Sequence, residues 1–124
     1  MQMNISMNMM NNSVLETDLA QVRRNAEAIV RAIPAGTKLL PVLKCDAYGL
    51  GAAEIARVLE PLEAVAGFAV AHVSEGLALR RAGIMKDLLV MSSALPWQLS
   101  AAVDADLTLP CGRAGFASEL QAAA

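Results

Sequence analysis

Residues 39–51 read LLPVLKCDAYGLG, an apolar run that ends on a lysine, Lys44, and is followed at once by a polar segment with two glycines. Such a run is typical of a strand buried in a sheet, where a lysine is rare unless it is paired. Two interpretations of Lys44 follow. It is either a strand-end residue whose amine is exposed to solvent, or a reactive amine placed in a pocket.

Alternate residues of a strand point to the same face of its sheet. Leu40, Val42 and Lys44 are therefore expected on one face of this run, and Leu39 and Leu43 on the other. If the first face lines the interior of a barrel, the amine lies at the carboxyl end of its strand. Folds of that kind place their active sites at this end of the sheet.

The segment after Lys44 predicts a loop that could hold a phosphate. Gly49 and Gly51 allow close approach of the backbone, and the start of the next helix offers free amide hydrogens. The phenol of Tyr48 could add a hydrogen bond to the same anion. Asp46 also has a local interpretation, in which its carboxylate orients its own loop. A single pair of glycines is a weak signal for an anion site.

Outward from this stretch, apolar runs alternate with helical patterns. The apolar runs begin near Leu39, Gly67, Leu88 and Leu107, and predict four strands in series. Helices are expected over residues 17–33, 52–59, 74–82, 96–103 and 113–121, with Thr17 or Asp18 capping the first and Ser74 capping the third. The pattern indicates an α/β fold of parallel βα units. Spacing alone leaves open whether these units form part of a (β/α)8 barrel or a small doubly wound sheet.

Composition limits the function classes. The chain has 124 residues and a formal net charge of −2, without the basic surface expected for binding nucleic acid or an anionic membrane. Residues 1–12 are polar and Met-rich, resemble neither a signal peptide nor a membrane span, and are expected to be disordered. A cytoplasmic location follows by default. Cys45 and Cys111 are expected to be reduced and half-buried, and a single histidine, His72, gives no metal cluster. His72 is expected at a strand end with a local hydrogen bond.

Several segments together resemble one enzyme family. LKCDAYGLG, residues 43–51, resembles the cofactor-lysine segment of the alanine racemases, V-K-A-[DN]-A-Y-G-H-G. LETDLAQVRRNAEAI, residues 15–29, resembles the opening strand and first helix of that family. The family's order and spacing continue in residues 34–44, 67–84 and 87–93, and more loosely to residue 124.

The resemblance implies a partial (β/α)8 TIM-type barrel, with about the first four βα units in an incomplete domain over residues 13–124. It implies that Lys44 is the catalytic residue and holds pyridoxal 5′-phosphate as an imine, while Tyr48 hydrogen-bonds the cofactor's phosphate. The implied reaction interconverts L-alanine and D-alanine, which supplies D-alanine for peptidoglycan. The full-length family is expected to form homodimers.

The sequence also departs from the family pattern. Cys45 replaces a usual alanine, and Leu50 replaces a frequent histidine. The family's second acid/base is a tyrosine from the partner subunit's carboxy-terminal domain, whereas this chain has one tyrosine, Tyr48. Part of the barrel and that domain are expected to be missing, so little activity is expected from the chain alone. A serine or broad-spectrum racemase fragment, a non-catalytic module that binds pyridoxal phosphate, and a structural remnant with an exposed Lys44 remain alternatives.

Overall fold

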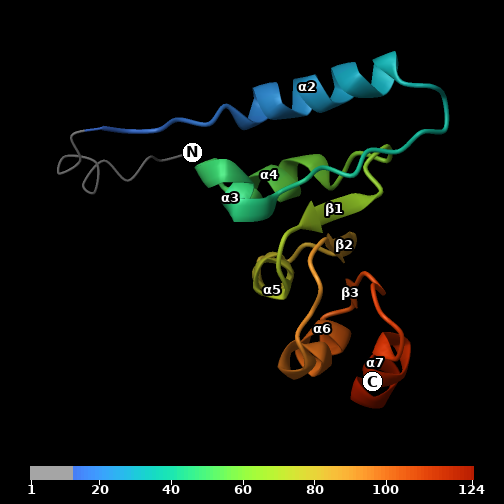
Figure 1. The fold of residues 1–124 in the computed structure, drawn as a ribbon. Helices are drawn as coiled ribbons and strands as arrows, with labels where there is room; N and C mark the ends of the chain where they lie inside the picture. Colours follow the sequence, from blue (N-terminus) through green and yellow to red (C-terminus); the bar gives the residue numbers. More distant parts are fainter. Residues whose placement is uncertain (1–12) are drawn as a thin grey trace.

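Three parallel strands form the sheet in the part of the chain that the computed structural model describes, residues 13–124 (Figure 1). They are β1 (Gly67–Val70), β2 (Asp87–Val90) and β3 (Leu107–Thr108), in the order β1-β2-β3. Phe68 pairs with Leu88, and Leu88 pairs with Leu107. The disorder predicted for residues 1–12 concerns a segment outside the described residues.

Helices alternate with these strands, and all but α3 overlap the predicted ranges, since the sequence predicts a loop after Lys44. They are α2 (Leu19–Ala32), α3 (Lys44–Gly49), α4 (Ala52–Leu59), α5 (Val73–Arg81), the 3-10 helix η1 (Pro96–Gln98), α6 (Leu99–Asp104) and α7 (Phe116–Ala123). Asp18 caps α2, because its carboxylate accepts a hydrogen bond from the backbone amide of Gln21 at 2.9 Å. The cap predicted at Ser74 is wrong, since α5 begins at Val73 and His72 holds its N-cap position.

The predicted strand from Leu39 does not form a regular strand. Residues 39–42 lie beside β1 in parallel, but the pairing consists of two isolated bridges, Leu39 with Val65 and Val42 with Ala69. Pro41 has no amide hydrogen to donate, and the backbone leaves the extended conformation directly after Val42, at Leu43. The prediction of four regular strands is therefore wrong, although the position of the first segment in the sheet is as expected.

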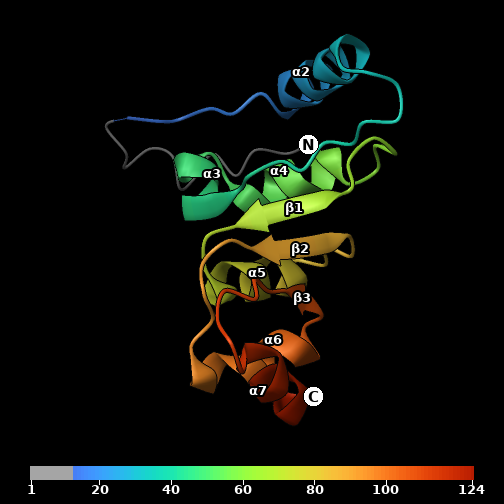
Figure 2. The same ribbon diagram turned by 45° about the vertical axis from the view of Figure 1, so that its right-hand side comes forward.

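The order of the strands distinguishes the two architectures left open by the sequence. Each parallel segment lies next to its predecessor: residues 39–42 beside β1, β1 beside β2, and β2 beside β3 (Figure 2). A doubly wound sheet reverses this order at a switch point, whereas a barrel continues in one sense. The described chain therefore has the arrangement of the opening part of a parallel barrel.

The helices and the sheet share a core on one side of the strands. Side chains at alternate strand positions are fully buried there, namely those of Phe68, Val70, Leu88 and Val90. The opposite face is partly open: Leu40, Val42 and Met91 are 43%, 49% and 42% exposed, whereas Ala69 is buried. The predicted alternation holds for the burial of Leu43 and the exposure of Leu40 and Val42. Lys44, predicted at the end of this strand, instead begins α3.

No helix among residues 13–124 combines the length and the apolar character needed to cross a membrane. Cys45 and Cys111 are free thiols, but both are exposed rather than half-buried as predicted. Residues 13–124 contain no group of three His, Cys, Asp or Glu side chains arranged for a metal ion.

Candidate functional site

The backbone after Lys44 forms a left-handed turn. Four consecutive residues, Cys45 to Tyr48, have φ between 51° and 56°, and none of them is glycine. For L-amino acids this conformation is disfavoured by about 1–2 kcal/mol per residue. It persists only where surrounding contacts hold it, and such strained segments are concentrated at functional sites.

Backbone hydrogen bonds within the segment hold this turn, among them that from the Leu50 amide to the Ala47 carbonyl at 3.2 Å. The Ala47 amide donates to the Leu43 carbonyl at 3.0 Å, and the Gly51 amide donates to the Asp46 carbonyl at 3.1 Å. The Ala47 side chain is buried in the core beside Leu43. Gly49 and Gly51 also have positive φ, 83° and 92°, so backbone conformation is sufficient to explain both glycines.

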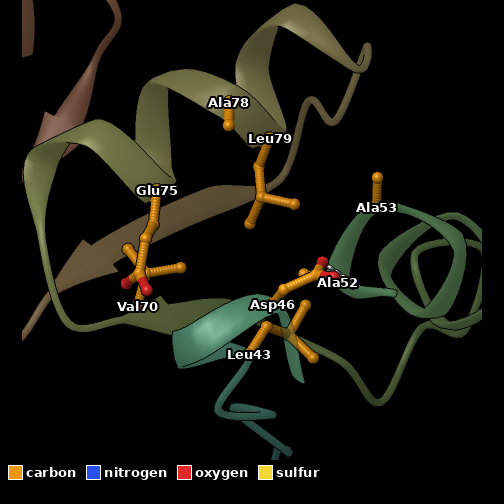
Figure 3. A pocket seen from close by; sticks show the side chains of 8 residues that line it. All are labelled: Leu43, Asp46, Ala52, Ala53, Val70, Glu75, Ala78 and Leu79. Carbon is orange, nitrogen blue, oxygen red and sulfur yellow. Dashed lines mark hydrogen bonds between the residues drawn. The ribbon is translucent and has the colours of Figure 1, made fainter. Parts of the chain in front are cut away.

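Asp46 connects the turn to the next helix. Its Oδ1 accepts a hydrogen bond from the Ala52 amide at 2.8 Å, and Figure 3 shows the carboxylate directed toward that first residue of α4. A carboxylate therefore satisfies one of the amides expected to remain free for a phosphate. The carboxylate of Asp46 thus has the local role that one interpretation of it expected, and the phosphate site at this loop stays a prediction.

Glu75, in the first turn of α5, connects the turn to β1. Its Oε1 accepts a hydrogen bond from the Cys45 amide at 2.7 Å, and its Oε2 accepts from the Ala71 and His72 amides at 2.7 and 3.1 Å. Partial burial raises the pKa of Glu75. The opposing effect is larger: the pKa is lowered by backbone hydrogen bonds from Cys45, His72 and Ala71 and by the nearby His72 ring. Its pKa therefore lies below the usual value of 4.5, and the carboxylate is charged at neutral pH.

Lys44 and Tyr48 are brought together by the turn. The Lys44 ammonium lies 5.9 Å from the centroid of the Tyr48 ring, and that ring is 73% exposed. Among residues 13–124, the Lys44 amine has no hydrogen-bond or ion-pair partner, whereas Lys38 donates to the Glu63 carbonyl at 2.9 Å. Lys86 also donates to backbone carbonyls. The described chain therefore leaves the Lys44 amine available and engages the other two.

A cavity of about 150 Å³ lies next to the turn, on the helical side of the sheet (Figure 3). Leu43, Val70 and Leu79 contribute its apolar wall, and Asp46 and Glu75 contribute carboxylates that are already bonded to backbone amides. Lys44 and Tyr48 do not line it. The cavity is therefore separate from the candidate amine site.

His72 forms the local hydrogen bond expected from the sequence. Its Nδ1 lies 3.2 Å from the Ser92 hydroxyl, and each of the two residues is the second after the end of its strand. The bond joins the ends of β1 and β2.

Glu75 is the residue of this site that sequence reasoning missed. The signal was the glutamate at the third helical position of HVSE, a spacing typical of a residue that caps its own helix. Assigning the cap to Ser74 concealed it. No local pattern could show that the same carboxylate also reaches Cys45, because that contact spans 30 residues.

Comparison with known proteins places the chain among racemases. The family described as "Alanine racemase, N-terminal domain" matches residues 17–124. The alanine racemase of Geobacter sulfurreducens is 44% identical over 86 residues, which are 69% of this chain and 22% of that protein. The alanine racemase of Aquifex aeolicus is 40% identical over 83 residues, 67% of this chain and 24% of that protein.

Solved structures agree. An alanine racemase from Clostridium difficile superposes with a TM-score of 0.79 at 30% identity, covering 85% of this chain and 28% of that one. An alanine racemase from E. faecalis superposes with a TM-score of 0.74 at 28% identity, covering 86% of this chain and 28% of that one. The chain thus spans about a quarter of the length of the relatives it matches.

Proposed function

The chain belongs to the alanine racemase family, and from that premise we propose that it carries the cofactor-lysine segment of a pyridoxal-phosphate-dependent alanine racemase. Because it spans about a quarter of its relatives, the reaction is proposed for the whole protein to which this segment corresponds. Residues 13–124 would be the incomplete first part of its barrel domain. The reaction would interconvert L-alanine and D-alanine and so supply D-alanine for peptidoglycan.

The observation that carries the proposal is the unpaired amine of Lys44. A lysine that forms a covalent bond to a cofactor must present a nitrogen not held elsewhere. Within residues 13–124 the Lys44 amine meets this requirement, while Lys38 and Lys86 donate to backbone carbonyls. The residues present therefore fit the cofactor, with Lys44 holding it through its amine and the Tyr48 hydroxyl donating to its phosphate.

The chain's own groups define what this segment would contribute to the reaction. When bound, pyridoxal phosphate supplies an electron sink for the charge left on the α-carbon of the substrate. The Lys44 amine would then accept or return a proton on one face of that carbon. Tyr48 lies on the same turn as Lys44, so we assign its hydroxyl the role of hydrogen-bonding the cofactor's phosphate. The acid/base on the opposite face would come from the partner subunit of a homodimer.

Cofactor capture tests the proposal. The purified 124-residue chain is mixed with substoichiometric pyridoxal phosphate, reduced with borohydride and mapped by peptide mass. Selective modification of Lys44, abolished in Lys44→Arg and retained in Lys38→Arg, supports the proposal. Equal modification of Lys38, Lys44 and Lys86 would refute it and leave Lys44 an ordinary surface lysine.

A module that binds the same cofactor without turnover is the second candidate. The chain has one tyrosine, Tyr48, and it lies beside Lys44. That position suits cofactor binding rather than a second proton transfer, which favours the binding module for the chain alone. Exchange of the α-proton of L-alanine in deuterated water separates the two. Capture of cofactor at Lys44 without such exchange would favour the binding module.

The substrate and location remain proposals as well. Alanine is the substrate named for the relatives, and a serine or broad-spectrum racemase stays the alternative. The cytoplasmic location expected from the sequence remains a prediction.

A further inference from the structure

The carboxylate of Glu75 is the link between the turn after Lys44 and the start of α5. Within the described chain, the hydrogen bond between the Cys45 amide and Glu75 Oε1 is the one that joins residues 44–49 to the connection between β1 and α5. The other carboxylate oxygen is occupied by the Ala71 and His72 amides. Glu75 is thus fixed at both oxygens, which makes it a rigid attachment point for Cys45.

This attachment acts directly on the backbone of Lys44. The Cys45 nitrogen belongs to the planar peptide group that begins at the Lys44 carbonyl, so holding that nitrogen fixes the ψ angle of Lys44. The donor of this bond is also the first residue of the left-handed run, Cys45, whose φ is 55°. The direction in which the Lys44 side chain leaves the backbone therefore depends on Glu75.

Glu60 provides a matched comparison for Glu75, because it has a purely structural role elsewhere in the fold. Glu60, at the end of α4, is half-buried like Glu75, and its Oε1 accepts hydrogen bonds from the Met85 and Lys86 amides at 2.7 and 2.8 Å. Those amides lie just before β2, at the end of the sheet opposite Lys44. Glu60 therefore performs the same kind of backbone bonding without contact with the turn.

We infer that Glu75 is a positioning residue for the Lys44 amine: by accepting the Cys45 amide it holds the peptide after Lys44 and sets the amine for reaction with the cofactor's carbonyl group. The inference rests on the proposed function. A charged carboxylate suits this task, since hydrogen bonds to an ionised acceptor are shorter and stronger than neutral ones. The lowered pKa of Glu75 agrees with an ionised acceptor at neutral pH.

The test compares three versions of the 124-residue chain: wild type, Glu75→Gln and Glu60→Gln. Each is measured for the share of captured pyridoxal phosphate on Lys44, for amide hydrogen exchange at residues 45–48, and for thermal unfolding. Exchange is expected to rise roughly tenfold or more in Glu75→Gln, because a hydrogen bond to a charged group is lost. In that variant the label is expected to spread to Lys38 and Lys86. Glu60→Gln is expected to lower the unfolding temperature without changing either property of the turn.

The outcomes separate positioning from stability. Unchanged exchange at Cys45 in Glu75→Gln, or an equal rise in both variants, would overturn the inference, as would an unchanged share of label on Lys44. If the wild-type chain shows no preference for Lys44, the proposed function fails, and the exchange comparison still decides whether Glu75 holds the turn. Should Glu75→Gln fail to fold, Glu75→Asp keeps the charge and shortens the reach, and an intermediate rise in exchange is expected.

Discussion

Gly67 lies so close to Asp87 on the neighbouring strand that a methyl group added to it would stand 2.3 Å from the Asp87 carbonyl oxygen. Both residues begin their strands and are paired in register, so neither backbone can move without disturbing β1 or β2. We predict that Gly67→Ala lowers the free energy of unfolding by about 1–3 kcal/mol, the usual range for overpacking. The shift of the urea midpoint measures it.

Gly76→Ala is the control for Gly67→Ala. A methyl group there would meet the Leu107 side chain at 3.0 Å, and a side-chain end can move aside. Alanine also stabilises a helix by about 1 kcal/mol relative to glycine, which offsets the contact. The urea midpoint of Gly76→Ala should stay near that of wild type, and equal losses in both variants would contradict the argument from backbone proximity.

Acid should remove the contribution of Glu75 to stability. Its folded-state pKa is below the usual value of 4.5 expected in the unfolded chain, so folding favours the ionised form. The contribution is fully present well above pH 4.5 and is lost as the pH falls through the lower folded-state pKa. The His72 ring and the Asp46 carboxylate lie near Glu75.

Urea unfolding of wild type and Glu75→Gln between pH 7 and pH 3 checks this prediction. The difference in unfolding free energy between the two should be constant at neutral pH and shrink below pH 4.5. A difference that grows toward acid pH would reverse the assigned sign and show that burial, rather than hydrogen bonding, dominates the pKa of Glu75.

Asp46 should contribute to stability through the cap of α4. Asp46→Ala removes the acceptor for the Ala52 amide, the first of α4, whose N-cap position is held by Gly51, and loss of one such hydrogen bond costs about 0.5–3 kcal/mol. Asp46→Asn keeps an oxygen at the same place and tolerates positive φ, so its unfolding free energy should stay close to wild type. Equal losses in Asp46→Ala and Asp46→Asn would show that charge, not capping, carries the effect.

Sequence reasoning predicted the alternation of helices and strands because each element has a local pattern. The helix over Ala52–Leu59 is predicted with its observed bounds, since its apolar spacing and the glycine before it are both local signals. The segment from Leu39 was predicted as a strand because its composition is apolar. Pro41, which lacks an amide hydrogen, predicts a gap in the hydrogen bonding of that strand, and the two bridges lie on either side of it. The turn after Leu43 has no such local signal.

The candidate site was predictable only in part. Lys44 and Tyr48 belong to one continuous motif, so their proximity follows from four residues of chain. The left-handed conformation of Cys45 to Tyr48 was not predictable from residue preferences, because none of these residues is glycine. The bond from Glu75 to Cys45 joins segments 30 residues apart and depends on the packing of α5 beside β1.

The hydroxyl of Tyr48 should matter for cofactor binding and not for folding. Its ring is 73% exposed, and Tyr48→Phe keeps the ring beside the Lys44 amine, so the substitution isolates the hydroxyl. A hydrogen bond to a charged phosphate is worth enough that its loss should raise the half-saturating concentration of pyridoxal phosphate roughly tenfold or more. Titration of the chain with cofactor, followed by reduction and quantification of modified Lys44, measures this concentration.

Thermal unfolding without cofactor is the control for Tyr48→Phe. The unfolding temperature should match wild type, because an exposed hydroxyl without a partner among the described residues contributes little to stability. A lower unfolding temperature would mean that the hydroxyl supports the turn itself. An unchanged half-saturating concentration would remove Tyr48 from the proposed phosphate site and leave the Lys44 amine as the sole cofactor contact assigned to this segment.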